Sequence, residues 1–134
     1  MASASIHEQQ AKHNYSLLKD LQEEEKFQDW QLTIAFYTAL HIIDCALTTE
    51  NPEWRRIYSE GGDPAGWHAV RKKCINSLFR DIFKNYRFLE EKSQLARYLE
   101  GVDKKAVDII TADQAKDYTD THLTPIMVKF SHSW

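Results

Sequence analysis

The stretch from Leu32 to Leu47 is apolar on nearly every side of a helix, and it is interrupted chiefly by Thr33, Thr38, His41 and Asp44. A helix that is hydrophobic all round has to be covered by other elements. This stretch is shorter than the ~20 apolar residues that cross a bilayer, and it carries two ionisable side chains. We therefore expect it to form the central helix of a soluble domain rather than a membrane span.

Turn-forming residues are scarce, with 4 Gly and 3 Pro among 134 residues. Sheets of many short strands use such residues at their turns, so the scarcity favours long helices. A chain of this length buries enough surface for one core without a metal or a disulfide. We expect a single all-α domain over residues 1–134, folded as an up-and-down bundle of four to five helices.

Apolar residues at helical spacing divide the chain into separate helices. The pattern predicts a helix from Ser5 to Leu21 and a second from near Trp30, with Asp29 as its N-cap. A loop is expected from Pro52 to Gly66, and a third helix from the cap at Asp63 and Pro64 to Phe83. A fourth helix is expected from Phe88 to Leu99 and a fifth after Thr111. The register changes near Tyr86, and we expect Gly101 to end the fourth helix in a left-handed conformation. Thr111 and Gln114 make a capping box, and Pro125 is expected to kink or end the last helix.

The cysteines, the histidines and the N-terminal segment bear on location and on metal binding. Cys45 and Cys74 stand in apolar stretches outside any CxxC pattern, so we expect buried, reduced thiols, with a regulatory disulfide as the alternative. Residues 1–22 lack the apolar run of a secretory signal, and we expect a cytoplasmic protein with no membrane contact. The histidines show no i, i+3 or i, i+4 pairing, and no phosphate-loop or zinc-protease motif occurs, so we expect no metal and no cofactor.

Positive charge is concentrated in residues 68–100, which hold eight Lys and Arg against four Asp and Glu, a balance of +4, while the whole chain carries a net charge of −3. The total excludes a strongly basic nucleic-acid binder. The local balance makes this segment the surface where an RNA backbone would bind. We take Lys72, Lys73, Arg80 and Lys84 as candidate RNA-binding residues, with a solvated pair of helices as the alternative interpretation.

His68 and Arg71 lie one turn apart at the start of the predicted third helix, so their side chains share a face. The positive end of the helix dipole would keep His68 neutral near pH 7 for work as a general base, while Arg71 would hold a phosphate. Arg97 adds a second guanidinium, and His41 stands in the apolar second helix, where burial requires a hydrogen-bond partner. We take these four residues as candidate catalytic residues. The structural alternative pairs Arg71 with a carboxylate and lets His68 cap its helix.

Four segments follow one pattern: FYTALH at 36–41, WHAVRKKC at 67–74, the step from Tyr86 to Leu89, and SQLARY at 93–98. Over residues 10–130 the chain resembles the HEPN superfamily of small prokaryotic α-helical domains. The resemblance implies a HEPN-like bundle, commonly a homodimer, that cleaves RNA without a metal or binds RNA or nucleotides, often in toxin–antitoxin or defence systems with an antitoxin partner. Nucleases of this superfamily carry an Arg, four to six residues and then a His, whereas this chain offers the pair in reversed order, with His68 three residues before Arg71.

Three functions remain open from the sequence. The first is an RNA- or nucleotide-directed protein, as a metal-independent endoribonuclease in which His68 takes the proton of a ribose 2′-hydroxyl while Arg71 and Arg97 stabilise the pentacovalent phosphate. The second is a non-catalytic helical interaction module or homodimeric scaffold. The third is a small-molecule pocket among four aromatic residues: Trp30, Tyr37, Trp54 and Trp67.

Overall fold

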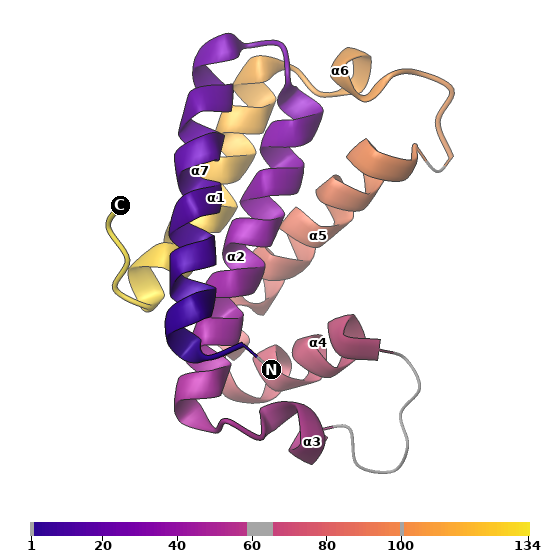
Figure 1. The fold of residues 1–134 in the computed structure, drawn as a ribbon. Coiled ribbons are helices and arrows are strands. Elements are labelled where there is room, and N and C mark those ends of the chain that lie inside the picture. Colours follow the sequence, from indigo (N-terminus) through magenta and orange to yellow (C-terminus); the bar gives the residue numbers. More distant parts are fainter. Residues whose placement is uncertain (1, 59–65, 100) are drawn as a thin grey trace.

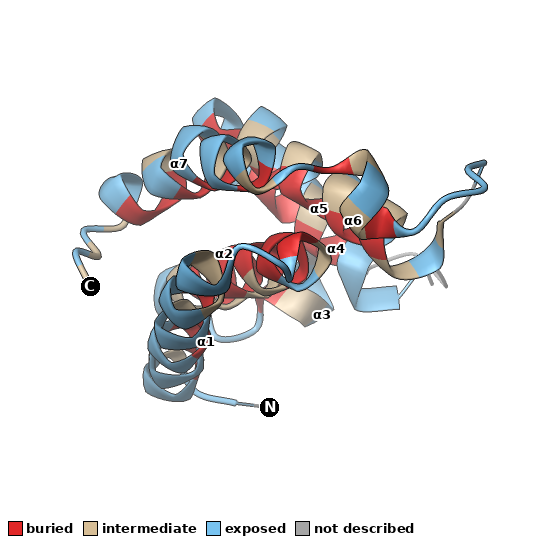
Figure 2. Cartoon of the chain, turned by 90° about the horizontal axis from the view of Figure 1, so that it is seen from above, coloured by how far each residue is buried: buried red, intermediate tan, exposed pale blue. Residues whose placement is uncertain are grey.

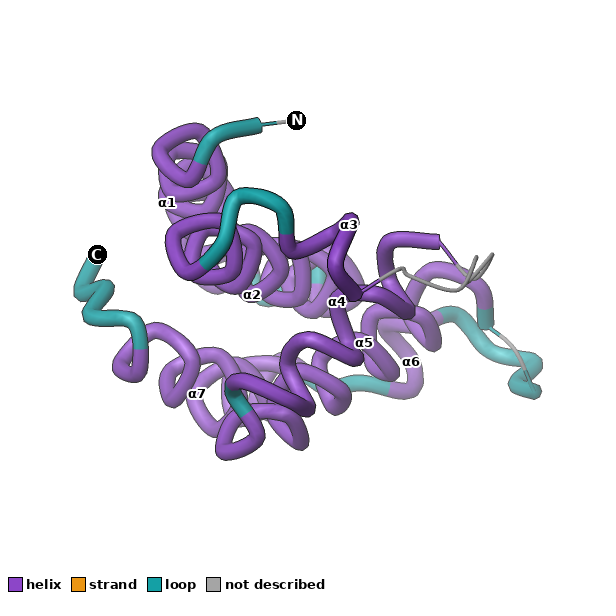
Figure 3. Tube along the Cα trace, turned by 90° about the horizontal axis from the view of Figure 1, so that it is seen from below, coloured by secondary structure: helices purple, strands orange, loops and turns teal. Residues whose placement is uncertain are grey.

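The computed structural model describes residues 2–58, 66–99 and 101–134, and these residues form helices joined by turns and loops, with no strand among them (Figure 3). The expected all-α class is therefore confirmed. The helices are α1 (Ala4–Glu24), α2 (Gln28–Glu50), α3 (Trp54–Tyr58), α4 (Gly66–Leu78), α5 (Phe83–Tyr98), α6 (Ala106–Ile109) and α7 (Ala112–Lys129), with a 3-10 turn, η1 (Arg80–Ile82), between α4 and α5.

α2 lies at the centre of the fold, with α1, α5 and α7 packed against it (Figure 1). α3 and α4 lie together at one end of α2, and α6 lies near the other end. Seen from above, the buried residues of α2, α5 and α7 are turned toward one another, whereas the outer side of α1 is exposed (Figure 2). The apolar second helix is thus the central one, as its sequence predicts.

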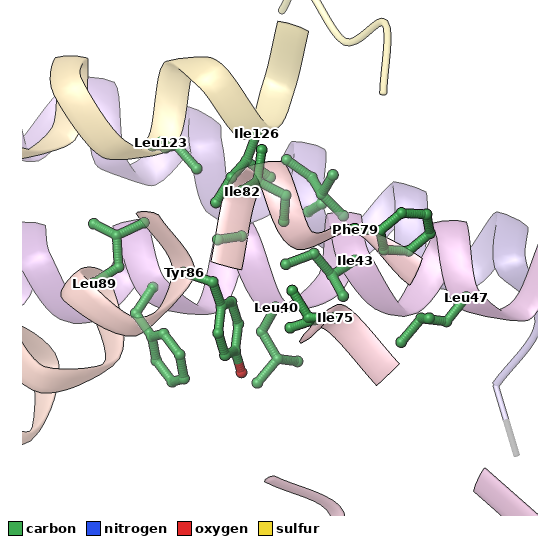
Figure 4. Close-up of a cluster of buried hydrophobic side chains, with 14 of the residues drawn as sticks. Leu40, Ile43, Leu47, Ile75, Phe79, Ile82, Tyr86, Leu89, Leu123 and Ile126 are labelled. Atoms are coloured by element: carbon green, nitrogen blue, oxygen red, sulfur yellow. The ribbon is translucent and has the colours of Figure 1, made fainter. Parts of the chain in front are cut away.

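The apolar surface of α2 is covered by the rest of the domain. Leu40, Ile43 and Leu47 of α2 meet side chains from α4, α5 and α7 in one core, where Tyr86 is fully buried (Figure 4). Within the described ranges, α2 alone is long and apolar enough to cross a membrane, with a mean hydropathy of 1.4, yet 61% of that window is buried inside the domain. Packing in the core accounts for its hydropathy.

The start of α2 differs from the expectation. The helix begins at Gln28 with Phe27 in the N-cap position, and no side chain caps it, so Asp29 is wrong as the N-cap. Asp29 lies in the first turn instead, where its charge faces the positive end of the helix dipole. Packing fixes this start, because Gln31 is buried and its side-chain amide donates to the carbonyl of Leu21 over 3.2 Å.

The loop expected from Pro52 to Gly66 contains a short helix. α3 begins at Trp54, whose side chain is buried in the core and whose Nε1 donates to Thr48 Oγ1 over 3.2 Å. Burial of this indole holds α3 against the end of α2. The predicted cap at Asp63 and Pro64 lies outside the described residues.

The expected break near Tyr86 is wrong, because α4 ends just before Phe79 and η1 turns the chain there. Apolar spacing continues through the turn, since Phe79 and Ile82 are both buried, and the pattern alone therefore hides the break. Phe79 packs edge to face on Phe130, which follows α7, with the ring centroids 4.9 Å apart. The turn at Phe79 thus coincides with a contact to a residue near the C-terminus.

The end of α5 also differs from the expectation. Leu99 takes the left-handed conformation there, with φ of +53°, and its N–H donates to the carbonyl of Leu95 over 3.0 Å. Gly101 is therefore wrong as the terminating residue, although its own φ is +77°. The side chain of Leu99 is only partly buried, so little packing offsets the cost of a left-handed leucine.

α7 begins as predicted and ends later than predicted. The capping box of Thr111 and Gln114 is confirmed by both of its hydrogen bonds. The helix continues through Pro125 to Lys129, so an end at the proline is wrong. Ile126 and Met127 are buried in the core. Their packing stabilises the helical turn in which Pro125 cannot donate a backbone hydrogen bond.

Candidate functional site

A buried ion pair joins α2 to α4. Asp44 is 1% exposed and Arg71 is 4% exposed. The guanidinium of Arg71 donates from Nε to Asp44 Oδ1 over 2.5 Å and from Nη2 to Oδ2 over 2.9 Å. Arg55 of α3 lies 3.5 Å from the same Oδ2 as a longer second contact. The two parallel hydrogen bonds fix the guanidinium of Arg71, and the carboxylate compensates its charge.

His68 is exposed in the first turn of α4, and its Nδ1 lies 3.4 Å from Nη1 of the buried Arg71. A guanidinium has only N–H donors, so Nδ1 has to accept and the proton of the neutral ring sits on Nε2. Partial burial lowers the pKa of His68, and the charges of Arg71 and Arg97 lower it further against the opposing Glu90. Near pH 7 His68 is therefore a neutral imidazole that presents an N–H at Nε2.

Arg97, in the last turn of α5, is held against α2. Its Nη1 donates to the hydroxyl of Tyr37 over 2.9 Å, and its Nε donates to the carbonyl of Ser93 over 3.3 Å. The guanidinium also lies over the rings of Tyr37 and Tyr98, 5.5 and 5.0 Å from their centroids. Within the described residues no carboxylate pairs with Arg97. Its positive charge is therefore uncompensated by any direct ion pair.

His41 is bonded to α1 rather than to the other candidate catalytic residues. Its Nδ1 lies 3.1 Å from Nδ1 of His7, so one ring donates to the other. His7 is 6% exposed, and its Nε2 has no hydrogen-bond partner among the described residues. Burial lowers the pKa of both rings. The structure thus brings His68, Arg71 and the charge of Arg97 together and gives His41 a contact between helices.

Two of the candidate RNA-binding residues lie on α4 with His68. Lys72 donates from Nζ to Oε1 of Glu90 over 3.1 Å, and Glu90 is 6% exposed. Lys73 is exposed on the same helix. The other two are exposed beyond the last turn of α4, whose end lies roughly 15 Å from His68 along the helix axis: Arg80 and Lys84. The candidate set therefore divides between the middle of α4 and the segment that follows it.

The aromatic residues suggested as one small-molecule pocket do not form one. Trp54 is 1% exposed in the core, whereas Trp30 and Trp67 are 55% and 52% exposed. Trp67 lies against the guanidinium of Arg55, 5.1 Å from ring centroid to Cζ. Trp30 lines a cavity with Arg97 between α2 and α5.

The thiols and the acidic groups offer no metal centre in the described ranges. No three or more His, Cys, Asp or Glu side chains of these residues are placed to hold one ion. Cys74 is buried and Cys45 is half-buried, and both are free thiols. Burial raises the pKa of Cys74 to about 11, so this thiol stays protonated and unreactive near pH 7.

Among the described residues, the charged groups that act on His68 or are bonded to those that do include more cations than carboxylates. The cations are Arg55, Arg71, Lys72 and Arg97, and the carboxylates are Asp44 and Glu90. The sequence did not predict Asp44 as the partner of Arg71 or His7 as the partner of His41. A signal existed for Asp44, because a carboxylate inside an apolar helix requires a buried cation. With these neutral and cationic N–H donors, the arrangement is able to bind an anion.

Comparison of this chain with protein-family models, with curated proteins and with solved structures gives no match.

Proposed function

We propose that this chain is a HEPN-like RNA-binding domain that holds the phosphates of single-stranded RNA between His68 and Arg97. The observation that carries the proposal is the guanidinium of Arg97, which pairs with no carboxylate among the described residues and is bonded to Tyr37. The ring of Phe36 connects this group to His68, because its centroid lies 5.2 Å from that of Tyr37 and 6.4 Å from that of His68. The four long helices α1, α2, α5 and α7, with α4 across one end, support the HEPN-like bundle. Homodimer formation, an antitoxin partner, a role in toxin–antitoxin or defence systems and a cytoplasmic location stay predictions of the sequence.

Both groups suit a phosphate oxygen. Arg97 offers a guanidinium that Tyr37 holds in place, which lowers the entropy lost when a ligand binds. His68 offers the N–H at Nε2 while Arg71 occupies Nδ1. Arg71 is a positioning residue in this arrangement, because its Nε and Nη2 are both bonded to Asp44.

Each of these donors has an exposed aromatic residue next to it in the chain. Trp67 precedes His68 in the chain and is 52% exposed, and Tyr98 follows Arg97 and is 62% exposed. Proteins that bind single strands combine cationic groups with aromatic rings on which bases stack. The combination favours a single strand over a duplex, because stacked and paired bases cannot reach such rings.

The geometry favours binding over cleavage. A general base that takes the proton of a 2′-hydroxyl needs a free lone pair, and the contact with Arg71 places the proton of His68 on the exposed Nε2. The charge of Arg71 is already compensated by Asp44, so it is poorly placed to stabilise a transition state. We therefore propose a catalytically silent member of the RNA-directed class.

The test is the affinity for a labelled single-stranded RNA of about ten nucleotides, measured by fluorescence anisotropy in low salt. Arg97→Gln should weaken binding about tenfold, because one charge-assisted hydrogen bond is worth roughly 1.5 kcal/mol. Arg87→Gln is the matched control, since it removes an exposed arginine of the same helix that is already paired with Glu91, and it should leave affinity unchanged.

Three results would contradict this proposal. Absence of RNA binding in low salt would remove it entirely. Equal affinity of the wild type and Arg97→Gln would favour the non-catalytic interaction module instead. Cleavage of the RNA in EDTA that His68→Ala abolishes would restore the metal-independent endoribonuclease and overturn the catalytically silent assignment.

A further inference from the structure

A cavity of about 240 Å³ lies where the first turns of α2 meet the last turn of α5, and it is lined by Asp29, Trp30, Thr33, Ala96 and Arg97. Pockets for drug-sized molecules have volumes of roughly 300–1,000 Å³, so this one suits a fragment of about the size of a nucleobase. Its lining combines an aromatic ring that can stack on a base, a carboxylate that can accept hydrogen bonds from the edge of the base, and a guanidinium that can bind a phosphate.

One wall of the cavity is aromatic and exposed. Trp30 is 55% exposed although it stands on the central helix of the fold. It lies seven residues before Tyr37, so the two side chains share a face of α2, and Tyr37 holds Arg97. The indole of Trp30 thus lies on the same face of α2 that holds the uncompensated cation.

Asp29 supplies the acidic group of the cavity. Its side chain is partly exposed, and no ion pair or side-chain hydrogen bond within the described residues engages its carboxylate. Only its backbone carbonyl is used, as the acceptor for the Thr33 hydroxyl over 3.0 Å. An ionised carboxylate is an acceptor with two oxygens, so it can accept two parallel hydrogen bonds from one ligand.

We infer that this cavity is a base subsite that prefers guanine, with the ring stacked on Trp30, its Watson–Crick edge at Asp29 and the phosphate at Arg97. Guanine presents two adjacent donors on that edge, the ring N1–H and the 2-amino group. Adenine and cytosine place a ring acceptor beside the amino group, and uracil places carbonyls on both sides of its N–H, so each would bring an acceptor against the carboxylate. The inference rests on the RNA binding proposed above and names its preferred base.

The experiment compares the four 5′-monophosphates and inosine 5′-monophosphate by isothermal titration calorimetry on the intact chain. GMP should bind at least about tenfold more tightly than AMP, CMP or UMP, because a charged acceptor discriminates strongly between donors and acceptors. Inosine monophosphate lacks the 2-amino group and should fall between GMP and AMP.

Two pairs of variants locate the preference. Asp29→Asn should remove the preference for GMP, whereas Asp113→Asn, which changes an exposed aspartate in the first turn of α7, should retain it. Trp30→Ala should weaken binding of all the nucleotides, and Trp30→Phe should retain most of it because a stacking surface remains.

The outcomes separate this inference from the proposed function. Equal affinity for GMP and AMP, or a preference for GMP that survives in Asp29→Asn, overturns the base subsite. If RNA binding is nevertheless weakened by Arg97→Gln, the phosphate site stands without it. If neither RNA nor any nucleotide binds, the proposed function and the base subsite are both overturned.

Discussion

Asp44 is a buried carboxylate that compensates a guanidinium that is also buried, so its removal has a large energetic consequence. The sequence singles out Arg71 as a candidate and leaves open whether a phosphate or a carboxylate faces it. Its partner stands 27 positions away, on another helix. Spacing along one helix predicts which residues share a face, but it does not predict which face of another helix lies opposite.

Removing Asp44 should destabilise the domain strongly. Asp44→Ala leaves the charge of Arg71 buried without a partner, and we expect the free energy of unfolding to fall by about 3–5 kcal/mol. The double variant Asp44→Leu, Arg71→Met should recover most of this loss, because the remaining side chains are apolar. Urea unfolding of the wild type, Asp44→Leu, Arg71→Met and the double variant measures the coupling. Strictly additive losses would show that the two side chains do not interact.

The paired histidines predict how stability changes with pH. Burial lowers the pKa of His7 and of His41, and Arg71 acts in the same direction on both rings while Asp44 acts against it. Arg55 also lowers the pKa of His7, and His7 lowers that of His41. An unfolded histidine has a pKa of about 6.5, so in acid the unfolded chain binds more protons than the folded one. The free energy of unfolding should therefore fall as the pH drops below about 6.5.

Urea midpoints at pH 7.5 and 5.5 measure this dependence, in the wild type and in His41→Gln. The variant should lose less stability between the two pH values than the wild type loses. His13→Gln provides the control, because His13 is exposed on α1 and forms no contact with the pair. Identical pH dependence in the wild type and both variants would show that the pair does not govern acid stability.

The sequence predicts well the helices whose bounds depend on residues that are close together in the chain. α7 begins at a capping box that four consecutive residues define, and α2 follows from its apolar run. The break at Phe79 escapes prediction because apolar spacing continues through it and the ring that Phe79 contacts lies beyond α7. α3 escapes because the burial of Trp54 depends on the end of α2.

The end of α1 allows a prediction for a single element. Glu25 adopts a left-handed conformation with φ of +52° and is exposed. Glu25→Gly should raise the free energy of unfolding by about 1 kcal/mol, since a left-handed residue with a Cβ costs roughly 1–2 kcal/mol. Glu24→Gly, one position earlier within the helix, should lower it by about 0.5–1 kcal/mol. Thermal unfolding of the two variants distinguishes them, and a lower Tm for Glu25→Gly would contradict the prediction.

For the molecule as a whole, charge sets how strongly RNA binding can depend on salt. The chain has a net charge of −3, and most cations near His68 are paired with carboxylates. Because His68 is neutral near pH 7, we expect Arg97 to neutralise about one phosphate, which gives a slope of about −0.7 for log K against log salt on a single strand. Anisotropy titrations at several salt concentrations measure it. A slope of −4 or steeper would require a larger basic surface than His68 and Arg97 provide. In that case Lys84→Gln would make the slope less steep.

The sequence also predicts the candidate site in part. It places His68 beside Arg71 through helical spacing, and it picks out Arg97 at the end of its helix. It attributes a neutral His68 to the helix dipole, whereas in the structure partial burial and the charge of Arg71 lower the pKa. Trp30 and Asp29 become a cavity wall only because α5 ends opposite them, and that arrangement depends on the whole fold.

α1 packs almost entirely on α2, and the C-terminal residues add a ring contact of Trp134 with Tyr15 at 6.1 Å between centroids. The other helices pack against α2 or against one another. Because α1 packs mainly on one other helix, we expect it to detach while the rest stays folded. Amide protons of α1 would then exchange with solvent sooner than those in the middle of α2, and the first species to appear under mild denaturation would be a shortened bundle with one bare flank.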